Sequence, residues 1–176
     1  MQNFARLLEQ LIFTPSRNGK LRHMRHYFAA EPDPDRGWAL AALTGALDIR
    51  TAKPAMLRNL AEARIDPTLF RLSYDYVGDM AETIALIWPE TDTHGEPPAL
   101  RHIIETLNTL PKKDIPDQIA AWLDRAPPEE RFALLKLITG GLRVGVSARL
   151  TKTALAAYGN VALEAVEEIW HALEPP

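Results

Sequence analysis

Apolar side chains recur three and four residues apart along almost the whole chain. The first such stripe is Phe4, Leu7, Leu8, Leu11 and Ile12. That spacing places the side chains on one face of an α-helix. Similar stripes predict helices over 21–28, 38–46, 56–61, 69–76, 80–88, 100–110, 115–123, 131–138, 148–157 and 161–173. Since no stretch alternates with the period of two that marks a strand, the pattern predicts an all-α fold of about ten helices.

Prolines separate most of these stripes. The densest break is the segment 89–98, PETDTHGEPP, which reads as a loop between two halves of the chain. We therefore expect a single domain, 1–176, with lobes 1–88 and 98–176 joined by this loop. Pro175 and Pro176 close the sequence, and we expect a domain boundary or a linker there.

The sequence contains an internal repeat at a distance of 95 residues. PDPDRGWALAALTGALDI (32–49) aligns with PPEERFALLKLITGGLRV (127–144). The identical pairs include Arg36/Arg131, Leu40/Leu135, Thr44/Thr139, Gly45/Gly140 and Leu47/Leu142. Two such units predict two lobes with approximate two-fold symmetry, and two equivalent turns would suit the two phosphate strands of duplex DNA. The alternative is a chance similarity between two helical hairpins.

Composition excludes several classes of protein. The chain is 47% apolar and 24% charged, which is typical of a globular protein, and it has no run of about 18 apolar residues that could span a membrane. It has no cysteine, which rules out disulfides and thiolate catalysis. Because the net charge is −3, any nucleic-acid binding must depend on a local basic patch.

The charges are unevenly distributed. Two windows, between Gln10 and Ala30 and between Arg131 and Leu163, contain no acidic residue. Their nine cations are Arg17, Lys20, Arg22, Arg25, Arg131, Lys136, Arg143, Arg149 and Lys152. The remainder of the chain has 11 cations and 23 anions. Two acid-free basic windows indicate a polyanionic partner, although one alone would more simply be a solvated basic face.

The segment ITGGLRVGVSARLTKTALA, 138–156, carries the clearest chemical signal. It predicts a helix closed by Gly140 and Gly141, a loop in which Gly145 allows close backbone approach, and a second helix capped by Ser147. A helix N-terminus presents free backbone N–H groups that suit a phosphate. The candidate phosphate-binding residues are Gly140, Gly141, Arg143, Gly145, Ser147, Arg149 and Lys152.

Other chemistry has little support in the sequence. A nucleotide-binding P-loop needs lysine where Val146 stands and a strand before the loop, so ATP binding at this turn is excluded. His23 and His26 have no carboxylate at ligand spacing, which argues against a metal site. Asp79 and Glu82 are more typical of a helix start than of a catalytic acid pair. We therefore predict no catalytic and no metal-binding residue.

Three segments resemble a known family. LKLITGGLRVGVSARLTKTALA, SYDYVGDMAETIAL and RNGKLRHMRHYF are similar to the N-terminal DNA-binding domain of ATP-dependent DNA ligases of the bacterial type. The resemblance covers nearly the whole chain. It implies an all-helical, two-lobed domain that lies along the minor groove of nicked duplex DNA, while separate catalytic domains close around the break.

The resemblance also implies partners and cofactors. The partners would be nicked duplex DNA and the protein's own catalytic domain in cis, with no membrane and with a monomeric chain, in the cytoplasm at the nucleoid. The family's lysine nucleophile lies in a K-x-D-G motif, which this sequence lacks. We therefore expect no cofactor in this chain, because ATP and Mg would bind the missing catalytic domain. We also expect that this chain alone seals no nick, whereas the whole ligase would do so in replication, repair or recombination.

The family's roles transfer to specific positions. Gly140, Gly141, Arg143 and Gly145 match its phosphate-gripping turn. The internal repeat extends this role to Thr44, Gly45, Arg50 and Lys53, and Arg17, Lys20 and Arg22 match its early basic helix in character.

Two alternatives remain. The first is a helical protein-interaction module with no nucleic-acid role. The second is a sequence-specific helix-turn-helix regulator. It is less favoured because the helix after the turn offers Thr151 and Thr153 but no Asn or Gln for base edges.

Overall fold

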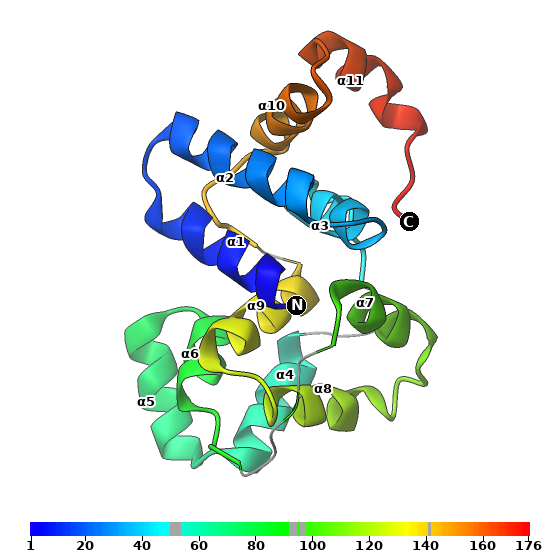
Figure 1. Ribbon diagram of the computed structural model, residues 1–176. Helices are drawn as coiled ribbons and strands as arrows, with labels where there is room; N and C mark the ends of the chain where they lie inside the picture. The colour runs from blue at the N-terminus through cyan, green and yellow to red at the C-terminus, as the bar shows by residue number, and fades with distance from the viewer. Residues whose placement is uncertain (50–53, 92–94, 96–97, 141) are drawn as a thin grey trace. The chain divides into compact units, whose positions relative to one another are not determined.

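The computed structural model describes residues 1–49, 54–91, 95, 98–140 and 142–176, and these form helices and loops without a strand (Figure 1). The helices are α1 (Gln2–Phe13), α2 (Arg17–Ala30), α3 (Asp35–Thr44), α4 (Pro54–Arg64), α5 (Pro67–Val77), α6 (Met80–Ile87), α7 (Leu100–Thr109), α8 (Ile115–Leu123), α9 (Pro128–Thr139), α10 (Ala148–Gly159) and α11 (Leu163–Ile169). A short 3₁₀ helix, η1 (Trp170–Ala172), follows. The predicted all-α fold is confirmed, and none of the described helices has the length and apolarity needed to cross a bilayer.

Side-chain caps fix where several helices begin. Ser16 accepts a hydrogen bond from the amide of Gly19 at 3.0 Å and starts α2. Asp66 caps α5 and Asp79 caps α6 in the same way. Such caps satisfy amide groups that have no partner within the helix. Asp79 therefore opens a helix, as predicted.

The chain divides into two compact units that differ from the expected lobes. The first unit comprises 1–5 and 49–141, and the second comprises 6–48 and 142–176. The expected division at the loop 89–98 is wrong, because helices on both sides of this loop share one core. In the first unit α6 packs on α9 and α4 packs on α8, and in the second unit α10 packs on α2 and α3.

The internal repeat is visible in equivalent hydrogen bonds. Arg36 donates to the carbonyl of Phe28 at 3.1 Å, and Arg131 donates to the carbonyl of Leu123 at 2.9 Å. Each acceptor lies eight residues before its arginine. The pair α2–α3 therefore corresponds to α8–α9, although the sequence alignment began only after these acceptors.

The repeat also explains the interleaved units. In each copy the chain leaves one unit after the Thr-Gly turn and enters the other, so α4 follows α3 but packs on α8, and α10 follows α9 but packs on α2. Each unit thus combines the hairpin of one copy with the last helix of the other. This exchange is the physical reason that a division at the proline-rich loop failed.

Candidate nucleic-acid interface

The segment after α9 has an unusual backbone. Gly140 ends α9 in the left-handed conformation, with φ of 70°. Arg143 has φ of 42° and Gly145 has φ of 72°, so two residues of the short turn 143–145 are left-handed. Between them Val144 is only 2% exposed, whereas Arg143 and Gly145 are exposed. A buried valine thus anchors a turn whose arginine lies at the surface. Gly141, the second predicted glycine, is outside the described residues.

Lys20 of α2 contacts this turn. Its ammonium Nζ donates to the carbonyl oxygen of Gly145 at 2.8 Å and lies 3.4 Å from that of Val144. A Cβ atom added to Gly145 would collide with the same ammonium group. The close backbone approach predicted for Gly145 is therefore present, and the group that approaches is a lysine of the protein itself.

The start of α10 follows the sequence prediction. The Ser147 hydroxyl accepts from the amide of Leu150 at 3.2 Å and caps the helix. Arg149, in the first turn, is exposed. Lys152 is partly covered, and its ammonium lies 4.7 Å from the centre of the Trp170 ring. Arg149 is thus available to a ligand, whereas Lys152 already has an aromatic partner.

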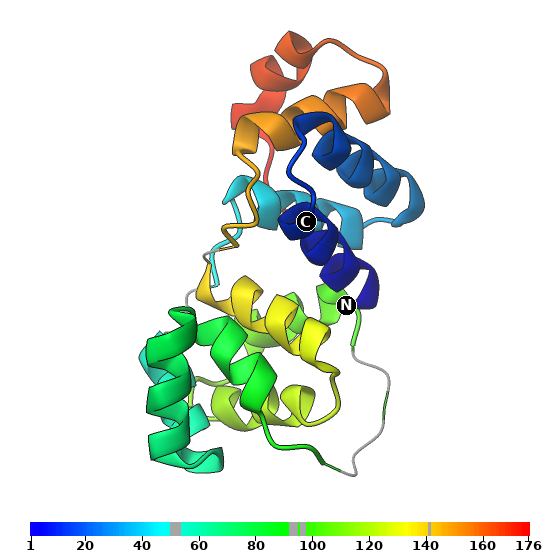
Figure 2. The ribbon, with the colours of Figure 1, turned by 90° about the vertical axis from the view of Figure 1, so that its left-hand side faces the viewer.

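The second unit brings the two basic windows together. α10 packs against α2, and the two views in Figures 1 and 2 both show these helices next to each other, with α11 continuing from α10. Arg17 and Arg22 are exposed on α2. The exposed cations of one acid-free window therefore belong to the same compact unit as Arg143 and Arg149 of the other.

Comparison with known proteins identifies the family. A family model described as DNA ligase N terminus matches residues 1–156. The chain belongs to this family, that of the N-terminal domain of ATP-dependent DNA ligases. No curated protein matches the chain.

In this ligase domain the first repeat provides a second Thr-Gly turn. Gly45 is exposed and left-handed with φ of 76°, as Gly140 is at the end of α9. The hydroxyl of Thr44 donates to the carbonyl of Leu40 at 2.8 Å and so closes the helix rather than facing a ligand. Arg50 and Lys53, the predicted cations of this turn, lie outside the described residues.

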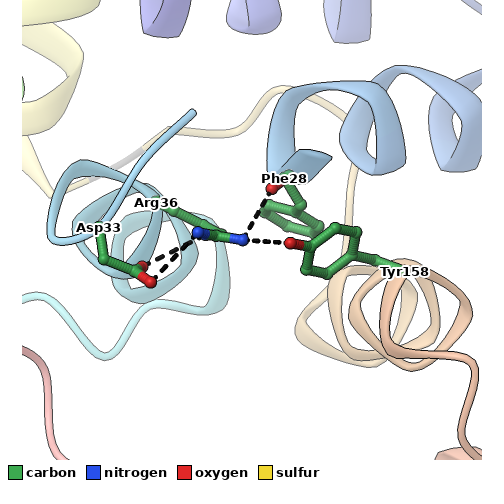
Figure 3. A network of polar contacts seen from close by, with 4 residues as sticks. All are labelled: Phe28, Asp33, Arg36 and Tyr158. Carbon is green, nitrogen blue, oxygen red and sulfur yellow. Dashed lines mark hydrogen bonds and ion pairs between the residues drawn. The ribbon is translucent and has the colours of Figure 1, made fainter. Parts of the chain in front are cut away.

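Sequence reasoning missed one polar network of the ligase domain. Figure 3 shows Arg36 of α3 reaching Asp33, the carbonyl of Phe28 and the hydroxyl of Tyr158. The ion pair with Asp33 measures 3.1 Å, and the guanidinium also lies 5.3 Å from the centre of the Tyr158 ring. The network joins α2, α3 and α10. Its signal in the sequence was the identity of Arg36 and Arg131 in the repeat.

Two cations of the second basic window do not belong to any solvent-facing patch. Arg131 is 3% exposed and bonds the carbonyls of Leu123 and Trp88, and Lys136 is 7% exposed and pairs with Asp79. These two residues were counted among the nine cations of the acid-free windows, but their burial leaves them unavailable to a polyanionic partner. Nearly all sides of α9 are buried, and inside the first unit Arg131 pairs with Glu90 at 3.6 Å while Lys136 pairs with Asp79.

The part of the ligase domain that the structure describes contains no cluster of three His, Asp or Glu side chains with metal-binding geometry.

The tryptophans serve mainly as core residues. Trp38, Trp88 and Trp122 are buried, whereas Trp170 is partly exposed and contacts Lys152.

Proposed function

We propose that this domain holds duplex DNA through its phosphate backbone, without reading the base sequence, as the non-catalytic part of an ATP-dependent DNA ligase. The observation that carries the proposal is the meeting of α2 and α10 in one compact unit. Arg17, Arg22, Arg143 and Arg149 are exposed there. Neither acid-free window contributes a carboxylate that would repel phosphates.

The geometry of the turn supports phosphate binding in particular. The first amides of α10 carry the positive end of the helix dipole, and Arg149 adds a cation in the same turn. Arg143 stands two residues before the exposed Gly145. Contacts of this kind fix the register of a protein on DNA but carry no sequence information.

A salt titration of DNA binding tests the proposal. We expect the affinity for a nicked duplex to fall with salt, with a log–log slope of about −0.9 for each phosphate neutralised. Arg143→Ala and Arg149→Ala should each weaken binding equally on unrelated sequences and flatten the slope by roughly one unit. Arg71→Ala, an exposed arginine of α5, is the matched control and should leave the slope unchanged. Binding that ignores salt would refute the proposal.

The finer details extend the same proposal. The domain would bind along the minor groove across a nick, as a monomer at the nucleoid, and deliver the DNA to its own catalytic domain in cis during replication, repair or recombination. ATP and Mg would act in that catalytic domain, since the chain has no K-x-D-G motif. Two measurements test this: comparison of nicked with intact duplex, and incubation with labelled ATP, where labelling of this chain alone would contradict it.

A second candidate function is docking of a protein partner. Leu69, Leu72 and Tyr76 of α5 are exposed at spacings of three and four residues, and Leu86 of α6 is also exposed. Such a stripe is typical of a helix-binding face. If Arg143→Ala combined with Arg149→Ala binds DNA as well as the parent, this second function is favoured.

A further inference from the structure

Lys20 has a different environment from the other cations of the second unit. Arg17 and Arg22 on the same helix are exposed, but Lys20 is partly covered and its ammonium faces two main-chain carbonyls. An ammonium group has three N–H donors and no acceptor. At least one, and by geometry two, of these donors are already directed at the turn 143–145.

The turn needs such support from outside. Left-handed backbone is unfavourable for a residue with a Cβ atom, and Arg143 adopts it at φ of 42°. Strained conformations of this kind persist only where the surroundings hold them. Burial of Val144 is one restraint, and the contacts from Lys20 to the carbonyls of Val144 and Gly145 are the other.

Gly145 makes this contact possible. A side chain at that position would occupy the space of the Lys20 ammonium, and φ of 72° independently favours glycine. The pairing joins residues 125 positions apart in the sequence. It thus ties the start of α2 to the turn that leads into α10.

We propose that Lys20 is a positioning residue: it holds the turn 143–145 in the left-handed form that presents Arg143, and does not itself neutralise a phosphate. The effect of Lys20 on phosphate binding rests on the proposed DNA-binding function. The contact of Lys20 with the turn 143–145 does not depend on that function. Lys20 was predicted to be one of three equivalent basic contacts with Arg17 and Arg22; in this proposal it instead supports the contact made by Arg143.

A double-mutant cycle tests whether Lys20 acts through Arg143. Lys20→Met removes the ammonium and keeps the length of the side chain. If Lys20 positions Arg143, Lys20→Met and Arg143→Ala should each weaken binding to nicked duplex about tenfold, and the double variant should be no weaker than Arg143→Ala alone. If Lys20 binds a phosphate itself, the losses multiply and the salt slope flattens by roughly two units, which overturns the proposal.

Arg22→Met is the matched control. Arg22 lies on the same helix, is exposed, and should act independently of the turn. Its effect should therefore multiply with that of Arg143→Ala. Coupling of Arg22 to Arg143 as strong as that of Lys20 would show a general charge effect and overturn the specific role of Lys20.

A measurement on the free protein separates this inference from the proposed function. In Lys20→Met we expect the backbone amide signals of Arg143, Val144 and Gly145 to shift and to exchange faster with solvent, while those of α9 stay unchanged. Gly145→Ala, which displaces the ammonium from the other side, should have the same effect. If the parent binds no DNA but these shifts occur, only the proposed function fails; if the turn is unaffected by Lys20→Met, the positioning role is refuted.

Discussion

The ammonium of Lys136 on α9 is paired with the carboxylate of Asp79 at the start of α6. Lys136 is buried, and the other oxygen of Asp79 accepts from the amide of Glu82 at 3.0 Å. Partial burial raises the pKa of Asp79. The hydrogen bonds from Lys136 and from the Glu82 and Ala81 amides, together with the Lys136 charge, outweigh burial and hold it below its usual range. One carboxylate therefore caps a helix and neutralises a buried cation.

Substitutions at Asp79 should separate these two roles. Asp79→Asn keeps an oxygen that can cap α6 but leaves Lys136 buried without a counter-charge, and we expect it to lower the free energy of unfolding by about 2–3 kcal/mol. Asp79→Ala also loses the cap, which should cost about 1 kcal/mol more. Urea denaturation followed by circular dichroism measures both values.

Replacing Lys136 provides the control for the ion pair. Lys136→Met removes the buried charge with little change in length, so the variant combining it with Asp79→Asn should regain most of the lost stability. Because the Asp79 pKa is lowered in the folded state, the advantage of the parent over Asp79→Asn should be full at neutral pH and disappear as the pH falls below about 4. A double variant as unstable as Asp79→Asn would contradict the ion-pair explanation.

Glu130 should have the opposite pH dependence. It is buried in the first turn of α9, and its Oε2 atom has no hydrogen-bond partner among the described residues. Burial is the largest influence on the pKa of Glu130 and raises it. The charge of the chain's amino terminus lowers the pKa and that of Glu129 raises it, so the net pKa is above its usual value. The unfolded chain therefore loses this proton first, and stability falls as the pH rises from about 4.3 through the folded value.

Glu130→Gln should therefore stabilise the protein at pH 7, by about 0.5–1 kcal/mol, and leave it unchanged near pH 3. Thermal unfolding at both pH values measures the difference. Glu129→Gln, at an exposed neighbouring position, is the control: it removes only the repulsion between the two carboxylates and should have a smaller effect than Glu130→Gln. Stabilisation by Glu130→Gln that is equally large at pH 3 would show that its charge is not the cause.

Helical periodicity and the repeat made the local structure predictable. The Thr-Gly pairs at 44–45 and 139–140 were predicted to end helices, and both do. These features depend on residues close together in the sequence, so one chain contains enough information to find them. The helix stripes and the caps at Asp79 and Ser147 belong to the same class.

Long-range pairing was not predictable from the same patterns. Apolar neighbours surround Lys136 in ALLKLI (133–138), which fits a buried helix, but nothing near either lysine in the sequence identifies Asp79 as the partner of Lys136 or Trp170 as that of Lys152. The contact of Lys20 with Gly145 depends on how α10 packs on α2. The exchange of helices between the two copies of the repeat could not be predicted from the helix pattern either, because that pattern does not depend on which helices pack together.

The two arginines of the repeat should differ in their contribution to stability. Arg131 is almost fully buried and serves the carbonyls of Leu123 and Trp88, so Arg131→Met should leave both unpaired and cost about 2–3 kcal/mol. Arg36 makes the equivalent bond to Phe28 at a site that water reaches, so Arg36→Met should cost about 1 kcal/mol. Urea midpoints measure the two losses, and equal losses would contradict the structural difference in burial.

The left-handed backbone of Arg143 allows stability and DNA binding to be separated. Glycine adopts φ of 42° without the steric cost that arginine bears, so Arg143→Gly should raise the free energy of unfolding by about 0.5–1 kcal/mol, after allowing for the greater freedom of glycine in the unfolded chain. The same change removes the guanidinium and should weaken binding to nicked duplex about tenfold. Urea denaturation and a salt titration of fluorescence anisotropy on one preparation measure both.

Arg149→Gly, in regular helix, is the control: it should weaken binding similarly but lower stability, since glycine costs about 1 kcal/mol there. A loss of stability in Arg143→Gly would show that the arginine side chain supports the turn, and would contradict the steric cost assigned to its left-handed backbone.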